Sequence, residues 1–143
     1  MQSAARFGTA FAVLAALSLA AVGCGSADGY PIMRKEQRDS DRLPTSFTNG
    51  MDVSDLEKNS TRLSAELDGT RYYLILNDES GEPGVPCLAI DGPDPMIGCG
   101  GGGVVTVTPA GRSGHAVQLV PSPAVSGDGW TAISDNVRVR AAG

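Results

Sequence analysis

The chain carries few of the side chains that nucleophilic catalysis needs. His115 is the only histidine among 143 residues, so a Ser-His-Asp or Cys-His hydrolase would have to use it as the general base. Its neighbour Ser113 lacks the G-x-S-x-G pattern that exposes a serine nucleophile. A surface histidine at the start of a strand is the simpler interpretation. We therefore predict that the chain is not an enzyme, and a hydrolase is the less favoured alternative.

A glycine-rich run at residues 98–103 satisfies the pattern G-x-G-x-x-G. Dinucleotide binding through that pattern needs a helix directly after it, whose N-terminus faces the pyrophosphate. Here a β-branched run at residues 104–108 follows instead. We expect a loop at this position, and we predict no cofactor.

Carboxylates form two clusters that would suit calcium or a pair of catalytic acids. The first cluster contains Asp78, Glu79 and Glu82, and the second contains Asp91 and Asp94. Neither fits the EF-hand pattern, and the distance between acids in separate turns cannot be read from a sequence. Solvated turns are the simpler interpretation. Weak calcium binding by these loops stays open.

The first 23 residues have the order of a secretory signal peptide. A single cation, Arg6, precedes an apolar run at residues 7–22, and small Gly23 comes directly before Cys24. The apolar run is somewhat shorter than the roughly 20 residues that cross a bilayer as a helix. We therefore predict that residues 1–23 are removed.

The residues around the predicted cleavage point, Ala21-Val22-Gly23-Cys24, resemble the lipobox of bacterial lipoproteins, although Ala21 stands where Leu is usual. The resemblance implies that Cys24 becomes the first residue of the mature protein and carries acyl chains. Attachment to the outer face of the cell membrane would then come from those chains. An ordinary secreted protein with a stray cysteine is the alternative.

Lipidation of Cys24 leaves Cys87 and Cys99, which we predict to form a disulfide, because paired cysteines outside the cytoplasm are usually oxidised. Closure of a loop of this length stabilises a fold by about 3 kcal/mol in the chain-entropy model. One histidine and an oxidised pair cannot supply the four nitrogen or sulfur ligands of a structural zinc site.

The charge balance bears on possible partners. The chain has 11 Lys and Arg against 16 Asp and Glu, a net charge of −5. Removal of residues 1–23 takes away Arg6 and no acid, which changes the net charge to −6. An acidic protein is a poor partner for nucleic acid and for anionic lipid headgroups, so we predict neither interaction.

Composition divides the remaining chain into a polar segment at residues 24–50 and a folded domain at 51–143. Residues 25–50 show no period of 2 or 3.6, which is typical of a flexible tether. From Thr61 the pattern alternates with period two, and Asp68-Gly69 then leads into a second apolar run. An Asp-Gly pair between two such runs predicts a β-hairpin. A continuous helix over residues 52–67 is the alternative.

Further short runs favour strands, and each is bounded by Gly, Pro, Ser or Asp. They lie at residues 86–90, 96–99, 104–108, 115–120, 129–134 and 137–141. This spacing predicts a mainly β domain, an antiparallel sandwich or small barrel of six to eight short strands.

Three large aromatic residues are candidates for a binding surface: Tyr72, Tyr73 and Trp130. Adjacent tyrosines on one strand point to opposite faces, so we expect one in the core and the other exposed. Core packing is the simpler interpretation for Trp130.

The whole arrangement resembles small lipoproteins of high-GC Gram-positive bacteria. The features that carry the resemblance are the lipobox, the polar tether, Tyr72-Tyr73, the cysteine pair and the closing segments at residues 129–130 and 136–139. The resemblance implies a small extracytoplasmic β-domain and assigns no catalytic residue.

These observations together favour a lipid-anchored, non-enzymatic binding module on the extracytoplasmic side of the cell membrane. Its partner would be a protein, a cell-wall component or a small ligand. A structural or accessory subunit of a membrane complex is the alternative. That role predicts an exposed apolar patch on one sheet, whereas ligand binding predicts a concave pocket.

Overall fold

The computed structural model describes residues 29–77, 84–101, 103–109 and 115–140. The predicted signal peptide and Cys24 lie outside the described residues. So do Ser113 and the first carboxylate cluster, Asp78, Glu79 and Glu82.

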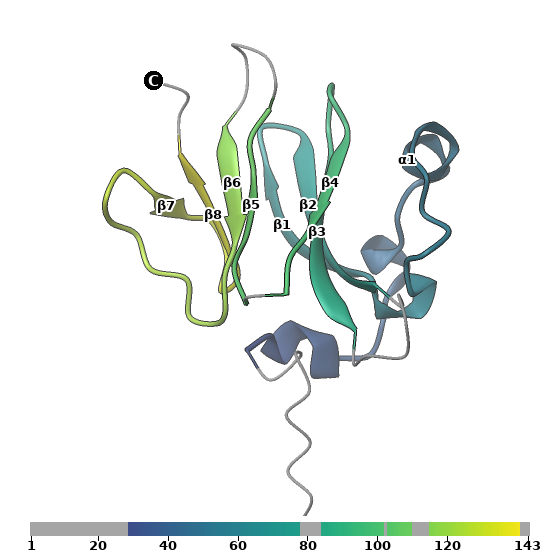
Figure 1. The fold of residues 1–143 in the computed structure, drawn as a ribbon, viewed down its shortest axis with the longest axis horizontal. Helices are drawn as coiled ribbons and strands as arrows, with labels where there is room; N and C mark the ends of the chain where they lie inside the picture. The colour runs from purple at the N-terminus through teal and green to yellow at the C-terminus, as the bar shows by residue number, and fades with distance from the viewer. Residues whose placement is uncertain (1–28, 78–83, 102, 110–114, 141–143) are drawn as a thin grey trace, which may run out of the picture.

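The described residues form two four-stranded antiparallel sheets that lie side by side (Figure 1). The first sheet has the order β1-β2-β3-β4, with β1 at Arg62–Leu67, β2 at Thr70–Asn77, β3 at Val85–Asp91 and β4 at Met96–Cys99. The second has the order β5-β6-β8-β7, with β5 at Val105–Val107, β6 at Ala116–Leu119, β7 at Thr131–Ala132 and β8 at Val137–Arg140. The prediction of a mainly β, antiparallel sandwich is confirmed.

The β1–β2 hairpin is the local structure that the sequence indicates most strongly. Asp68 and Gly69 have φ angles of 50° and 76°, as the two central residues of a type I′ turn require. The hairpin prediction is confirmed, and the helical alternative over residues 52–67 is wrong.

A register shift in β1 changes which face its side chains occupy. Leu63 lies opposite Tyr73, and Ala65 lies opposite Tyr72, with the irregularity between them. Leu63 therefore packs on the outer face of the first sheet, whereas Ala65 enters the core between the sheets. A regular strand would have placed both residues on one face.

The main core lies between the two sheets, and strand alternation supplies it. Its fully or nearly fully buried members from β2 and β3 are Tyr72, Leu74, Leu88 and Ile90. The second sheet contributes Val105, Val107, Val117, Leu119, Val137 and Val139. Tyr30 closes this core at one end.

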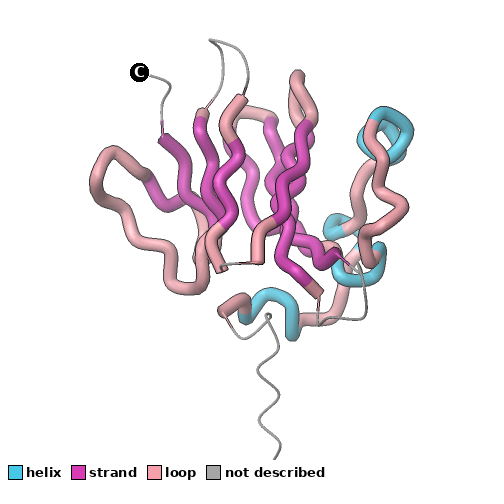
Figure 2. Tube along the Cα trace, viewed as in Figure 1, coloured by secondary structure: helices cyan, strands magenta, loops and turns pink. Residues whose placement is uncertain are grey.

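A second apolar layer covers the outer face of the first sheet. The α-helix α1, Thr45–Gly50, places Phe47 against Tyr73 and Ala89, and Leu56 packs against Ile75 and Cys87. In Figure 2 this helical and loop segment lies beside the first sheet, away from the second. The two central strands of the first sheet are therefore buried on both faces.

The prediction of a flexible tether is wrong for residues 29–50, which belong to the folded unit. They form η1, Pro31–Arg34, η2, Asp39–Asp41, and α1, and a further short helix, η3, spans Lys58–Ser60. Tyr30 and Phe47 are each only 1% exposed. The buried apolar residues of this segment come one at a time from separate short turns and helices. Their spacing therefore has no regular period in the sequence.

Polar groups attach this segment to β1. Arg62 is buried, and its guanidinium donates hydrogen bonds to the backbone carbonyls of Lys35, Asn59 and Thr61, at 2.6 to 3.1 Å. Charge-assisted bonds of this kind satisfy a buried cation without a carboxylate.

Asp41 supplies the complementary contact. One of its carboxylate oxygens accepts a hydrogen bond from the backbone N–H of Leu63 at 3.0 Å, and the other accepts one from the N–H of Arg38 at 2.7 Å. β1 is an edge strand, and edges with unpaired N–H groups invite pairing with other chains. The segment at residues 35–41 thus protects this edge.

Candidate functional site

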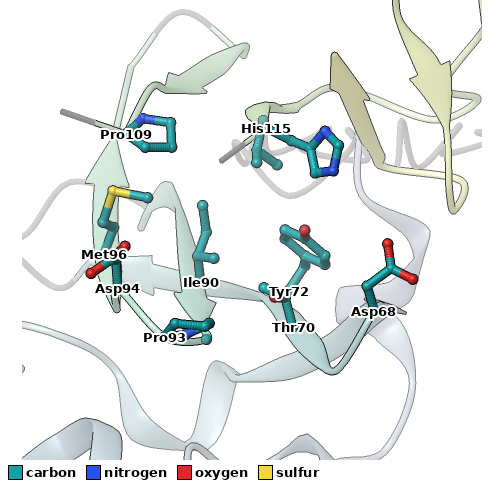
Figure 3. A pocket seen from close by; sticks show the side chains of 11 residues that line it. Asp68, Thr70, Tyr72, Ile90, Pro93, Asp94, Met96, Pro109 and His115 are labelled. Carbon is teal, nitrogen blue, oxygen red and sulfur yellow. The ribbon is translucent and has the colours of Figure 1, made fainter. Parts of the chain in front are cut away.

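A pocket of about 280 Å³ opens at one end of the sandwich (Figure 3). It lies where the β1–β2 turn, the β3–β4 turn and the ends of β5 and β6 meet. Its apolar walls include Ile90, Met96 and Val117, and its volume is near the lower limit for small-molecule sites.

Polar groups line the rim of this pocket. Figure 3 places Asp68 and Asp94 on opposite sides of it, with His115 above Tyr72. Both carboxylates belong to exposed turn residues. Burial raises the pKa of Tyr72, and the charge of Asp68 raises it further. Tyr72 is thus protonated at neutral pH, and its phenol makes no hydrogen bond to another described residue.

His115 is an exposed residue directly before β6. In the described part of the chain, its imidazole makes no hydrogen bond to a hydroxyl or a carboxylate. The structure therefore places the predicted turn-to-strand histidine at the pocket rim.

The second carboxylate cluster does not converge on a common point. Asp91 is bonded to Arg71 on the neighbouring strand, with N–O distances of 2.5 and 3.0 Å, whereas Asp94 lines the pocket. Among the residues that the structure describes, no three His, Cys, Asp or Glu side chains are grouped closely enough to hold a metal ion.

The cysteine pair lies where the sequence predicts it. Cys87 and Cys99 face each other across β3 and β4 and form a disulfide, with Cα atoms 4.0 Å apart. The glycine-rich run next to it has a packing role. A Cβ atom on Gly98 would lie 2.7 Å from a methyl group of Val107, so the close approach of β4 to β5 requires glycine there.

Tyr72 and Tyr73 point to opposite faces of β2, as predicted, but neither is exposed. Tyr72 lies in the core between the sheets, and Tyr73 lies under the layer that contains Phe47. The expectation of one exposed tyrosine is wrong because the segment at residues 43–56 covers the outer face. The Tyr73 hydroxyl is buried and has no hydrogen-bond partner among the described residues.

Trp130 is buried, as the core-packing interpretation expects, but it lies outside the apolar clusters on the two faces of the first sheet. It is 9% exposed, and the guanidinium carbons of Arg138 and Arg140 lie 5.3 and 4.7 Å from its ring centroid. The three aromatic residues therefore do not form one binding surface. Tyr72 borders the pocket, Tyr73 is covered, and Trp130 lies under two arginines.

Sequence reasoning missed the pocket itself. The signal that would have found it is the alternation of strand direction: the Asp68-Gly69 turn, the turn at residues 92–95 and the connection before His115 all fall at the same end of an antiparallel fold. The two turn acids, Asp68 and Asp94, are brought together only by that topology.

No protein-family model matches the chain, and neither a curated protein sequence nor a solved structure is significantly similar to it. Within the described residues, no helix has the length and apolar character needed to span a membrane.

Proposed function

We propose that the chain is a lipid-anchored extracytoplasmic binding module that takes a small amphipathic ligand into the pocket at the end of the sandwich. The observation that carries the proposal is this apolar pocket with two carboxylates at its rim. Acyl chains on Cys24 would attach the module to the outer face of the cell membrane.

The position of the pocket suits such an anchor. The described chain begins at the other end of the sandwich, where Gly29 packs against Pro121 and the Tyr30 hydroxyl donates a hydrogen bond to the carbonyl of Gly103 at 2.5 Å. In Figure 1 this end lies at the bottom and the β1–β2 turn lies at the top. A lipid on Cys24 would therefore leave the pocket open toward the aqueous side.

The pocket lining defines the ligand's chemistry. Its walls suit a small apolar body, and Asp68 and Asp94 attract a positive group at the mouth. The phenol of Tyr72 provides a hydrogen-bond donor. An alkyl or arylalkyl amine, which is protonated near neutral pH, supplies both the apolar body and the positive group.

An accessory role in a membrane complex is less well supported. That role calls for an exposed apolar patch, but the exposed large hydrophobic residues in the described part are only Val104 and Val125. The concave pocket is the feature that ligand binding predicts.

The proposal can be tested by titrating the full chain, held in phosphatidylcholine nanodiscs, with n-butylamine and n-butanol. The methyl resonance of Met96 reports on the pocket, and those of Met33 and Met51 are internal controls. We expect both probes to shift the Met96 signal. We expect the amine to bind about fivefold more tightly, because partly exposed carboxylates add modest electrostatic attraction.

The matched variants separate charge from shape. Asp68→Asn combined with Asp94→Asn should abolish the preference for the amine and leave butanol binding intact. Asp135→Asn, at the other end of the sandwich, should change neither. If Met96 responds to neither probe, or if the amine preference survives in the double variant, the proposed ligand class is wrong.

A further inference from the structure

The outer face of the second sheet carries a polar row that the pocket does not use. Along β8, Val137 and Val139 enter the core, so Arg138 and Arg140 point to the opposite face. Gln118 of β6 and Thr106 of β5 lie on the same face, in register with Arg138.

Arg138 is held in place at several points. Its Nε donates to Oε1 of Gln118 at 2.8 Å, and the amide of Gln118 donates to the hydroxyl of Thr106 at 3.0 Å. Nη1 of Arg138 also makes a long bond of 3.4 Å to the carbonyl of Val125. Among the residues that the structure describes, Nη2 of Arg138 makes no hydrogen bond.

Trp130 orients both guanidinium groups. The cation–π contacts of Arg138 and Arg140 with this one ring restrict the motion of both side chains. Arg140 is exposed, and within the described residues neither arginine is paired with a carboxylate. Two like charges above one ring repel each other, and a shared anion would relieve that repulsion.

We propose that Arg138 and Arg140, positioned by Trp130, form a binding site for phosphate groups carried along an anionic polymer of the cell envelope. Planar guanidinium groups bind phosphate oxygens through paired hydrogen bonds, and prior orientation reduces the entropy lost on binding. The net charge of the chain is negative, so the attraction must come from this local pair.

The direction of β8 favours a polymer over lipid headgroups. β8 begins at Val137, near the end where Gly29 lies, and reaches Arg140 at the end that carries the pocket. With the proposed anchor, lipid headgroups would lie at the Gly29 end. The choice of a polymer over lipid headgroups thus rests on the proposed function. The binding of phosphate by Arg138 and Arg140 does not depend on it.

Trp130 is the only tryptophan in the chain, so its fluorescence reports directly on this site. The full chain in phosphatidylcholine nanodiscs would be titrated with inorganic polyphosphate. We expect a saturable change in Trp130 fluorescence that weakens with added salt. Arg140→Gln should reduce affinity about tenfold, since one charge-assisted interaction is lost.

Arg42→Gln is the matched control, because Arg42 is an exposed arginine beside Leu56 and Ile75 on the outer side of the first sheet and makes a long ion pair with Asp39. This variant should bind polyphosphate like the unmodified chain. Arg140 makes no hydrogen bond in the described part of the chain, so its replacement removes only the cation–π contact with Trp130 and should lower the thermal unfolding temperature only slightly.

Three outcomes would overturn the proposal. The first is no saturable response to polyphosphate, and the second is equal affinity in Arg140→Gln and Arg42→Gln. The third is a response only in nanodiscs that contain equal amounts of phosphatidylcholine and phosphatidylglycerol, which would assign the site to lipid headgroups. None of these outcomes depends on the Met96 signal, so this proposal and the pocket proposal can fail separately.

Discussion

All three tyrosines of the chain are buried, and each phenol has a different environment. The Tyr30 hydroxyl donates to a backbone carbonyl, Tyr72 borders the pocket, and the Tyr73 hydroxyl has no partner among the described residues. Burial raises the pKa of each phenol, and that of Tyr30 reaches about 12. Burial in this fold therefore favours the protonated form at all three positions.

This pattern predicts a loss of stability at alkaline pH. An unfolded tyrosine titrates near pH 10, so the stabilising contribution is complete below about pH 10 and disappears as the pH rises through the higher folded-state values. The free energy of unfolding in urea should thus fall steadily above about pH 10. Tyrosinate absorbance should develop together with the loss of the circular dichroism signal.

Tyr30→Phe provides the control for this prediction. Near neutral pH it should be less stable by about 1 kcal/mol, because the carbonyl of Gly103 loses its donor. Above about pH 10 its stability should fall less steeply than that of the unmodified chain. Equal slopes in the two proteins, or tyrosinate absorbance that develops in the folded state near pH 10, would contradict the assignment.

At the scale of elements, the segment at residues 35–41 covers the edge strand β1 and is held there by side-chain hydrogen bonds. Arg62 and Asp41 join it to β1 in opposite senses, since one donates to backbone carbonyls and the other accepts from backbone N–H groups. Gln37 adds bonds to the carbonyls of Lys58 and Thr61. Asp39 and Asp41 both belong to this segment, but only Asp41 contacts the backbone of β1.

Asp41→Ala should therefore lower the free energy of unfolding by about 1 to 3 kcal/mol, because the Leu63 N–H loses its acceptor at a part-buried site. Amide hydrogen exchange at Leu63 should accelerate in the same variant. The nearby Asp39→Ala should change stability by less than about 0.5 kcal/mol, since the Asp39 side chain is fully exposed. If the two variants are equally stable, the contact from Asp41 does not hold the segment.

Local patterns predicted the strands well, because a strand's signal lies within its own residues. The hairpin follows from Asp68-Gly69, and β3, β6 and β8 lie within one residue of the runs that indicated them. The covering layer could not be predicted this way. Phe47 and Tyr30 are single apolar residues in polar surroundings, and only the folded sheet provides the surfaces that they cover.

The candidate sites show the same division. The disulfide was predictable from two cysteines and the oxidising compartment that the signal-like N-terminus predicts, whereas the pocket needs three turns from separate hairpins to meet at one end. Trp130 and its arginines are ten or fewer residues apart, but their contact depends on a reversal of the chain between β7 and β8. The bulge in β1 likewise moved Leu63 to a face that simple alternation did not indicate.

At the scale of the whole molecule, the proposed anchor depends on one atom, the sulfur of Cys24. Cys24→Ser should either release the protein from the membrane or leave an uncleaved precursor, because the acyl chains have no attachment point. Fractionation of cells followed by intact-mass measurement distinguishes these forms. His115→Ala should fractionate like the unmodified chain. Unchanged mass and unchanged membrane retention in Cys24→Ser would rule out the lipid anchor.

Because residues 29–50 are folded, the proposed anchor would hold the domain close to the membrane surface. With Cys24 in the membrane and folded structure from Gly29 onward, the intervening chain spans at most about 18 Å when fully extended. Gly29 would then stay within about 18 Å of the anchored cysteine, and the membrane surface would restrict the rotation of the domain. Ligands would have to come close to the bilayer to reach the pocket, and a cut within those few residues would release the domain.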